Sequence, residues 1–384
     1  MPSDKINKTS LEALGITLSG KLGNPEVTLL DDPRLDPRIV TALIEASMTF
    51  PAQQPNVHGN MTYEDAVDFT MYSHRLMETL GEGIARTMPD FRGIESYERS
   101  VDGDGGHKID LLIDRPKDAH FPMPCIVHLH GGGMIFDTAR NASNVRWRKS
   151  LAELNALVVG VEFRNEGLSE GHQPFPAGLD DCVAAVRWVH ENRDELQISS
   201  IIVIGESGGA NLAISTALRG NAEGWGDAID GVYAMAPMLY GFYDTPPEGL
   251  LSWHENLGLM GDHATVRAMR LVYDPEQAFK DNPFCNPLFA PSDLLRGLPP
   301  HIIRNYELDL IRDEGVVFAQ RLRAAGVEAT SQIVNGAHHV PEIAMPDAIP
   351  ELTRDTLSSI AAFAYHCARS RGLRVTHCGS SASR

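Results

Sequence analysis

Apolar runs alternate with segments of helical periodicity through most of residues 109–334. The apolar runs are continuous, which is typical of strands buried on both faces of a sheet. Helical spacing marks the segments between them, for example residues 178–196 and 313–326. This alternation predicts an α/β fold with a mainly parallel central sheet and helices on both faces. The expected strands are residues 109–113, 125–130, 156–163, 201–205, 231–237, 301–308 and 328–334.

Two segments interrupt this alternation and predict a helical cap. The first, at the N-terminus, has turn signals and an amphipathic run at residues 61–83. The second, residues 239–291, is too long for a simple crossover between strands. The alternative is that both are surface helices without a role at a site. The expected organisation is an N-terminal helical cap region at 1–95, a first core part at 96–238, a cap insertion at 239–291, a second core part at 292–372 and a flexible tail at 373–384.

Composition limits the classes of function. The 384 residues include 33 basic and 51 acidic side chains, a formal charge of −18, which argues against nucleic-acid binding. The N-terminus lacks the apolar core of a signal peptide and no later run is apolar enough for a membrane span, so we expect a cytoplasmic protein without a membrane partner. Five scattered cysteines without a CxxC pair argue against a disulfide framework and a structural zinc site.

Ser207 lies between glycines at the point where an apolar strand meets a helix-like run. The sequence GESGG at residues 205–209 fits the G-x-S-x-G nucleophile elbow, in which small residues permit a tight strand-to-helix turn. The turn holds the serine hydroxyl above the sheet edge, and the helix that follows offers free N–H groups. The alternative is a glycine-rich turn that only starts a helix. The position after a buried strand favours the nucleophile.

Three consecutive glycines, Gly131, Gly132 and Gly133, follow another apolar strand. Their N–H groups are unobstructed by side chains, as an oxyanion hole requires. A phosphate-binding loop is the alternative, but neither GxxxxGK[ST] nor a G-x-G-x-x-G with a partner acid is present. We expect His130, which precedes the glycines, to brace the loop rather than to transfer protons.

A serine nucleophile needs a base, and the base needs an acid that orients it. In folds with this elbow the acid and then the histidine follow the serine along the chain. The candidates after the next two strands are Glu307, Asp309, Asp313 and Glu314 as acids and His338 and His339 as bases. Asp309 lies just past a strand end, whereas Asp313 and Glu314 are placed to cap a helix. Loops after neighbouring parallel strands meet at one sheet edge, so acid and base can converge there.

Four motifs in this order resemble the hormone-sensitive-lipase-like group of α/β-hydrolase carboxylesterases: HGGGM, GESGG, ELDLIRDEG and GAHH. The resemblance covers residues 95–370 and implies an α/β-hydrolase fold with a helical cap. It implies that Ser207 is the nucleophile, Asp309 the acid and His339 the base, because the family's histidine lies three residues after a glycine. It also implies that the oxyanion hole is formed by the N–H groups of Gly132, Gly133 and Gly208.

This chain departs from the family pattern at two places. The commoner elbow reads GDSAG, whereas this chain has Glu206 and Gly208, and we expect Glu206 to support the site through altered hydrogen bonding. Val340 and Pro341 follow the histidine in place of the family's usual small residue and aromatic. The second departure concerns the shape of that loop, not the identity of the triad.

The resemblance implies a serine carboxylesterase that needs no cofactor and no metal. Short- to medium-chain esters are our substrate hypothesis, because no lipid-anchoring segment is apparent. A lactone or amide hydrolase of the same fold and a non-catalytic ligand-binding homologue are the alternatives. The DGDGGH sequence at residues 102–107 lacks the Gly and Glu that a calcium loop requires and is expected to form a hairpin turn. Expected partners are a small-molecule ester and, from the family's habit of pairing through a sheet edge, a second copy of the chain.

Overall fold

An eight-stranded sheet forms the centre of the computed structural model, which describes residues 26–46, 60–119, 122–168, 172–241 and 249–380. The strand order is β1-β2-β4-β3-β5-β6-β7-β8. β2 pairs antiparallel with both β1 and β4, and all the other pairs are parallel, which confirms the mainly parallel sheet. The strands are β1 Ile94–Asp102, β2 Lys108–Pro116, β3 Met123–Leu129, β4 Leu157–Glu162, β5 Ile198–Glu206, β6 Gly231–Met235, β7 His301–Tyr306 and β8 Ala329–Val334.

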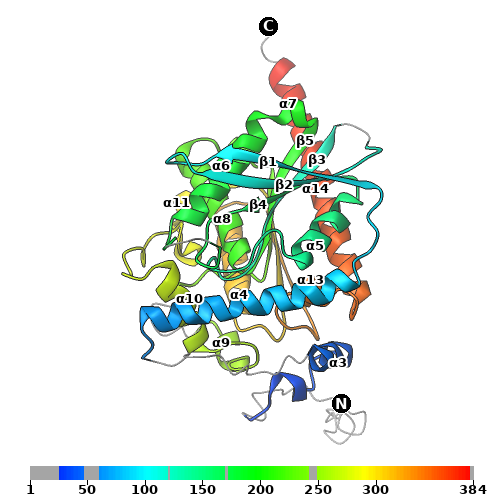
Figure 1. Cartoon of the computed structure of the whole chain (residues 1–384). Coiled ribbons are helices and arrows are strands. Elements are labelled where there is room, and N and C mark those ends of the chain that lie inside the picture. Colours follow the sequence, from blue (N-terminus) through cyan, green and yellow to red (C-terminus); the bar gives the residue numbers. More distant parts are fainter. Residues whose placement is uncertain (1–25, 47–59, 120–121, 169–171, 242–248, 381–384) are drawn as a thin grey trace, which may run out of the picture.

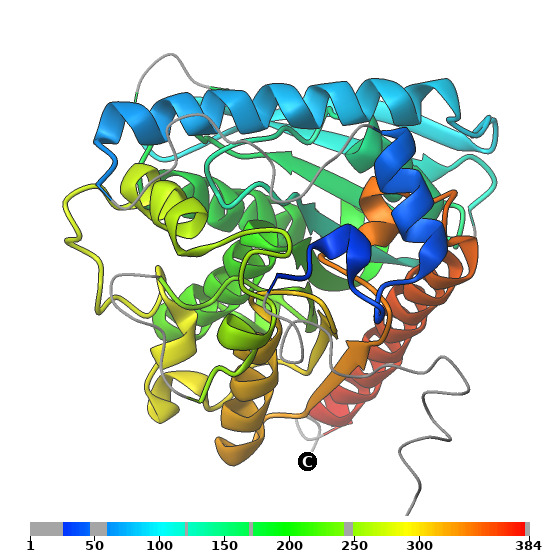
Figure 2. The same cartoon turned by 90° about the horizontal axis from the view of Figure 1, so that it is seen from below.

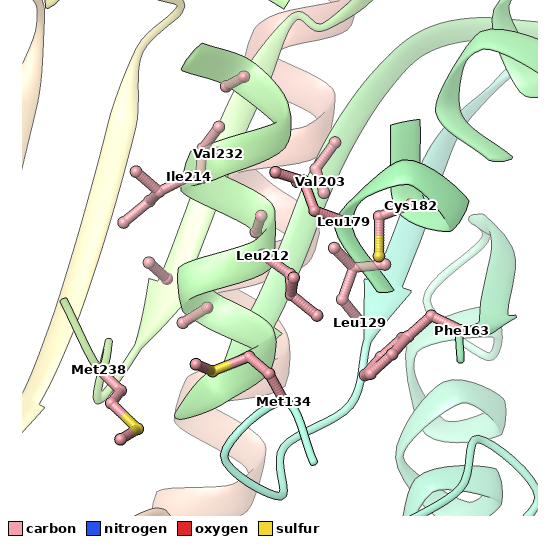
Figure 3. Packing of buried hydrophobic residues seen from close by; sticks show 14 of the residues in the cluster. Leu129, Met134, Phe163, Leu179, Cys182, Val203, Leu212, Ile214, Val232 and Met238 are labelled. Atoms are coloured by element: carbon pink, nitrogen blue, oxygen red, sulfur yellow. The ribbon is translucent and has the colours of Figure 1, made fainter. Parts of the chain in front are cut away.

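Helices cover both faces of this sheet (Figure 1). Successive strand residues point to opposite faces, so Val203 packs in one core cluster with Leu212 of α8, and its neighbour Ile202 packs in the other with Phe363 of α14. Figure 3 shows part of the first cluster, between the sheet, α6 and α8. The longer helices of the two layers are α5 Ala142–Ala152, α6 Ala177–Glu191, α8 Gly208–Glu223, α12 Arg312–Ala324 and α14 Pro350–Ser380.

The segments expected to form a cap are helical. Thr62 and Asp65 form a reciprocal capping box that begins α4 Tyr63–Arg86, and Asp36 caps α3 Pro37–Glu45. The later insertion contributes α9 Ser252–Glu255, α10 His263–Tyr273 and η3 Pro287–Phe289. α4 packs against α10, and the two lie together on one side of the molecule in Figure 2. A cap function for these segments stays a prediction.

Short elements join the larger ones. They are η1 Leu29–Asp31, α7 Arg193–Leu196, η2 Gly226–Ala228, α11 Ser292–Leu295 and α13 Pro341–Ala344. The hairpin turn expected at residues 102–107 joins β1 to β2, and Gly105 and Gly106 adopt φ values of 87° and 83° there. Residues 373–380, expected as a flexible tail, continue α14, and residues 381–384 lie outside the described residues. Within the described chain, no helix combines the length and apolar character needed to cross a membrane.

Candidate active site

Ser207 occupies a strained turn between β5 and α8, with φ 55° and ψ −119°. The neighbouring glycines make this turn sterically possible. A β-carbon on Gly205 would lie 2.3 Å from the Gly209 carbonyl oxygen, and one on Gly209 would lie 2.0 Å from the Leu129 carbonyl oxygen. Positive φ at a non-glycine residue is rare and is characteristic of functional turns. The local backbone of a nucleophile elbow is therefore present at the position that the sequence indicated.

The glycine loop after β3 lies against this elbow. A β-carbon on Gly208 would lie 2.4 Å from the Met134 backbone nitrogen, so the start of α8 touches the loop directly. Gly132 and Gly133 adopt φ values of 95° and 58°. In the part of the chain that the structure describes, no hydrogen bond occupies the N–H groups of Gly132, Gly133 or Gly208. These three donors are therefore available beside Ser207.

The Glu206 carboxylate links the elbow to the glycine loop. Its Oε1 accepts a hydrogen bond from the Gly131 N–H at 2.8 Å, and its Oε2 accepts one from His128 Nε2 at 3.1 Å. His130 stacks on Phe163 with ring centroids 4.1 Å apart, and its Nδ1 donates to the Gly131 carbonyl oxygen at 2.9 Å. Both residues therefore brace the loop. His128 was not singled out in the sequence, because its partner is 78 positions away along the chain.

Asp309 and His339 meet beyond the ends of β7 and β8. His339 Nδ1 donates to Asp309 Oδ2 at 2.7 Å, and the Ile311 N–H donates to Asp309 Oδ1 at 3.1 Å. Burial opposes the charged form of the imidazole, but the charge and hydrogen bond of Asp309 outweigh it and raise the pKa of His339 above the usual 6.5. Glu206 adds to this increase, so the histidine loop lies within electrostatic reach of the elbow.

His338 faces a different environment from that of its neighbour. Its Nδ1 donates to the His339 carbonyl oxygen at 3.2 Å, and burial lowers the pKa of His338 to about 4. Val340 follows with φ 47°, an unusual conformation for a β-branched residue, and Pro341 begins α13. Of the two histidines, only His339 is hydrogen-bonded to Asp309. Among the described residues, no hydrogen bond joins Ser207 to His339.

The other candidate acids hold loops in place. Glu307 accepts from the Gly336 N–H at 2.8 Å, and Asp313 accepts from the Ser252 N–H at 2.8 Å. Glu314 accepts from the Leu239 and Tyr240 N–H groups at 2.6 and 2.8 Å. Burial raises the pKa of Glu314 to about 8 against the effect of these donors. All three carboxylates therefore accept hydrogen bonds from backbone N–H groups of other loops.

Asn256, in the insertion after β6, supports the Asp309 loop. Its side-chain amide donates to the Glu307 carbonyl oxygen at 2.9 Å and to the Asp309 carbonyl oxygen at 2.8 Å, and the residue is fully buried. This role could not be predicted, because an asparagine in a polar insertion has no sequence spacing that connects it to Asp309. The inserted segment thus contributes directly to the backbone around the acid.

Comparisons with known proteins show which proteins this chain resembles. A family model described as alpha/beta hydrolase fold matches residues 126–342. Carboxylesterase NlhH of Mycobacterium tuberculosis is 31% identical over 299 residues, which cover 77% of this chain and 85% of that protein. The solved structure of brefeldin A esterase, a bacterial homologue of human hormone-sensitive lipase, superimposes with a TM-score of 0.86 at 36% identity and covers 92% of this chain and 99% of its own.

A second solved structure, that of esterase Est22, gives a TM-score of 0.77 at 32% identity, and the match covers 88% of this chain and 99% of that one. The similarity therefore extends from the elbow and the glycine loop to most of both chains. The α/β-hydrolase fold expected from the sequence is confirmed. This chain belongs to the hormone-sensitive-lipase-like family of α/β-hydrolase-fold proteins.

Proposed function

We propose that this chain is a serine carboxylesterase that hydrolyses short- to medium-chain carboxylic esters. Its family and its esterase relatives support the general class, a carboxylic ester hydrolase. The observation that carries the proposal is the strained Ser207 turn packed against a glycine loop with three available N–H groups. The paired Asp309 and His339 side chains complete the set of groups that acyl transfer needs.

The proposed reaction has two acyl-transfer steps. His339 Nε2 accepts the Ser207 proton while the hydroxyl oxygen attacks the ester carbonyl carbon, and the N–H groups of Gly132, Gly133 and Gly208 stabilise the resulting oxyanion. The protonated imidazole then gives its proton to the leaving alcohol as the C–O bond breaks. Water, deprotonated by His339, attacks the acyl-enzyme, and the proton returns to Ser207 as the acid leaves. Asp309 orients the ring throughout.

The pH dependence of kcat/KM tests the role of Asp309. Only neutral His339 can accept a proton, and its pKa is raised, so kcat/KM should increase with pH through an apparent pKa above 6.5. Asp309→Asn removes the charge that raises this pKa, so its profile should shift to lower pH while the plateau falls by about 10⁴-fold. An unshifted profile with an unchanged plateau would remove Asp309 from the proposed mechanism.

Glu206→Ala should lower kcat by roughly 10- to 100-fold with little change in KM, because the Gly131 N–H would lose its acceptor and the oxyanion loop would loosen. Glu206→Gln keeps a carbonyl oxygen for that N–H and should retain most of the activity. Steady-state kinetics on p-nitrophenyl butyrate compares the two variants. Equal losses in both would show that the negative charge matters rather than the hydrogen bond.

Matched substrates distinguish the ester hydrolase from its alternatives. We expect the wild-type protein to hydrolyse p-nitrophenyl butyrate. It should hydrolyse p-nitrobutyranilide at least about 100-fold more slowly, because an amine leaving group depends more on proton transfer from the imidazole before it can depart. A preference for the anilide or for a lactone would favour the alternative hydrolases. Ligand binding without turnover of any substrate would favour the non-catalytic homologue. The cytoplasmic location and the homodimer stay predictions.

A further inference from the structure

A small cavity of about 20 Å³ is lined in part by residues whose backbone N–H groups are hydrogen-bonded to the Ser207 carbonyl oxygen. Its wall includes Met134 from the oxyanion loop, Asn211 from the first turns of α8 and Met238 from the loop after β6. The Met238 N–H donates to the Ser207 carbonyl oxygen at 3.3 Å, so this wall is attached to the elbow itself. Figure 3 shows Met134 and Met238 on either side of the start of α8. The cavity is therefore close enough to receive part of a bound ester.

The position of the cavity indicates which part of the ester would enter it. The leaving alcohol must take its proton from His339, so it has to face the loops that carry His339 and Asp309. None of the described residues that line the cavity belongs to those loops. The cavity is therefore assigned to the acyl chain of the ester rather than to its leaving alcohol.

Met269 of α10 closes this side of the site. A β-carbon on Gly133 would lie only 2.7 Å from Met269 Sδ, so the thioether rests directly over the oxyanion loop. Met269 also lines the cavity, together with Tyr240 and Tyr273. A space of this size holds about one water molecule, which leaves room for only a very short acyl chain. An unbranched methionine is the kind of side chain that fills such a gap.

Building on the proposed esterase function, we infer that Met269 is the residue that limits acyl-chain length. The thioether blocks the path from the oxyanion loop into the space between α8 and α10. The preferred substrates are therefore esters with acetyl- to butyryl-sized acyl groups. Shortening this one side chain should extend the acyl site along the buried side chains of Met238 and Tyr240.

The test measures kcat/KM on p-nitrophenyl acetate, butyrate, hexanoate and octanoate, a series in which only the acyl group changes. Each additional buried methylene is worth about fourfold in kcat/KM. Met269→Ala should therefore raise the ratio of hexanoate to acetate by on the order of tenfold or more, with acetate hydrolysis little changed. Met269→Phe should act in the opposite direction and lower the ratio of butyrate to acetate. Met269→Leu should keep the wild-type profile.

Met260→Ala is the matched control, because Met260 belongs to the same inserted segment and packs in the other core cluster, not against the cavity. Its profile should parallel that of the wild type. If the wild type hydrolyses the series but both Met269→Ala and Met269→Phe leave the profile unchanged, Met269 does not limit the chain length. If the wild type hydrolyses none of the esters, the proposed function itself fails, and the two failures are thereby distinguished.

Discussion

Ser207→Ala is expected to lower kcat for a p-nitrophenyl ester by on the order of 10⁵- to 10⁶-fold, since a serine acting with its base as a unit accounts for most of the chemical step. The residual rate should exceed that of the uncatalysed reaction, because the three N–H groups remain. KM should change little, as alanine fits the same turn. Steady-state and single-turnover kinetics of the purified variant measure this loss.

Ser100→Ala serves as the control for serine replacement, because Ser100 is exposed on β1 and hydrogen-bonds Asp110 across the hairpin. It should keep wild-type kinetics. Circular dichroism and thermal unfolding should show that both variants are folded. A Ser207→Ala protein that retained more than about one-tenth of the wild-type kcat would mean that another group attacks the ester.

His339→Asn is expected to cause a loss of similar size, on the order of 10⁵-fold or more in kcat, because asparagine cannot accept the serine proton. His338→Asn should cost less than about tenfold, since the asparagine amide can still donate to the backbone carbonyl that His338 now contacts. The two variants differ by one position in the same loop. Measuring both on one ester therefore separates the two adjacent histidines cleanly.

The opposite ranking, with His338→Asn inactive and His339→Asn active, would contradict the proposed base. The pairing of His339 with Asp309 at 2.7 Å would then have only a structural role. A double variant offers a further check. If His339 and Ser207 act as a unit, Ser207→Ala combined with His339→Asn should be about as slow as either single variant, because such effects are not additive.

The fold could be predicted wherever burial determines the pattern of the sequence. β3 to β7 are mainly apolar because helices cover the sheet there, and the structure contains a strand at each expected position. β1 was missed because it is an edge strand, and most of its side chains are exposed. The helical pattern of α5 is weak in the sequence because this helix buries polar side chains: Arg148 pairs with Asp114 at 3.0 Å inside the protein. A hydrophobicity pattern does not detect such pairs.

The candidate site also has one part that could be predicted from the sequence and another that could not. The Ser207 turn is a local property, since its glycines are required by backbone contacts within a few residues or with the adjacent strand. The supports of the site are not local. Asn256 reaches the Asp309 loop across 53 positions, and Glu314 reaches Tyr240 across 74. The left-handed turn at Val340, directly after the two histidines, has no signal in the residue type.

Covalent labelling tests the central claim, that Ser207 is the nucleophile, most directly. Wild-type protein treated with an organophosphate such as diethyl p-nitrophenyl phosphate should release one p-nitrophenol per chain and lose activity in parallel. Mass spectrometry of the digested protein should then find the diethylphosphoryl group on Ser207, and Ser207→Ala should remain unlabelled. Labelling of a different residue, or inactivation without any label on Ser207, would contradict the account.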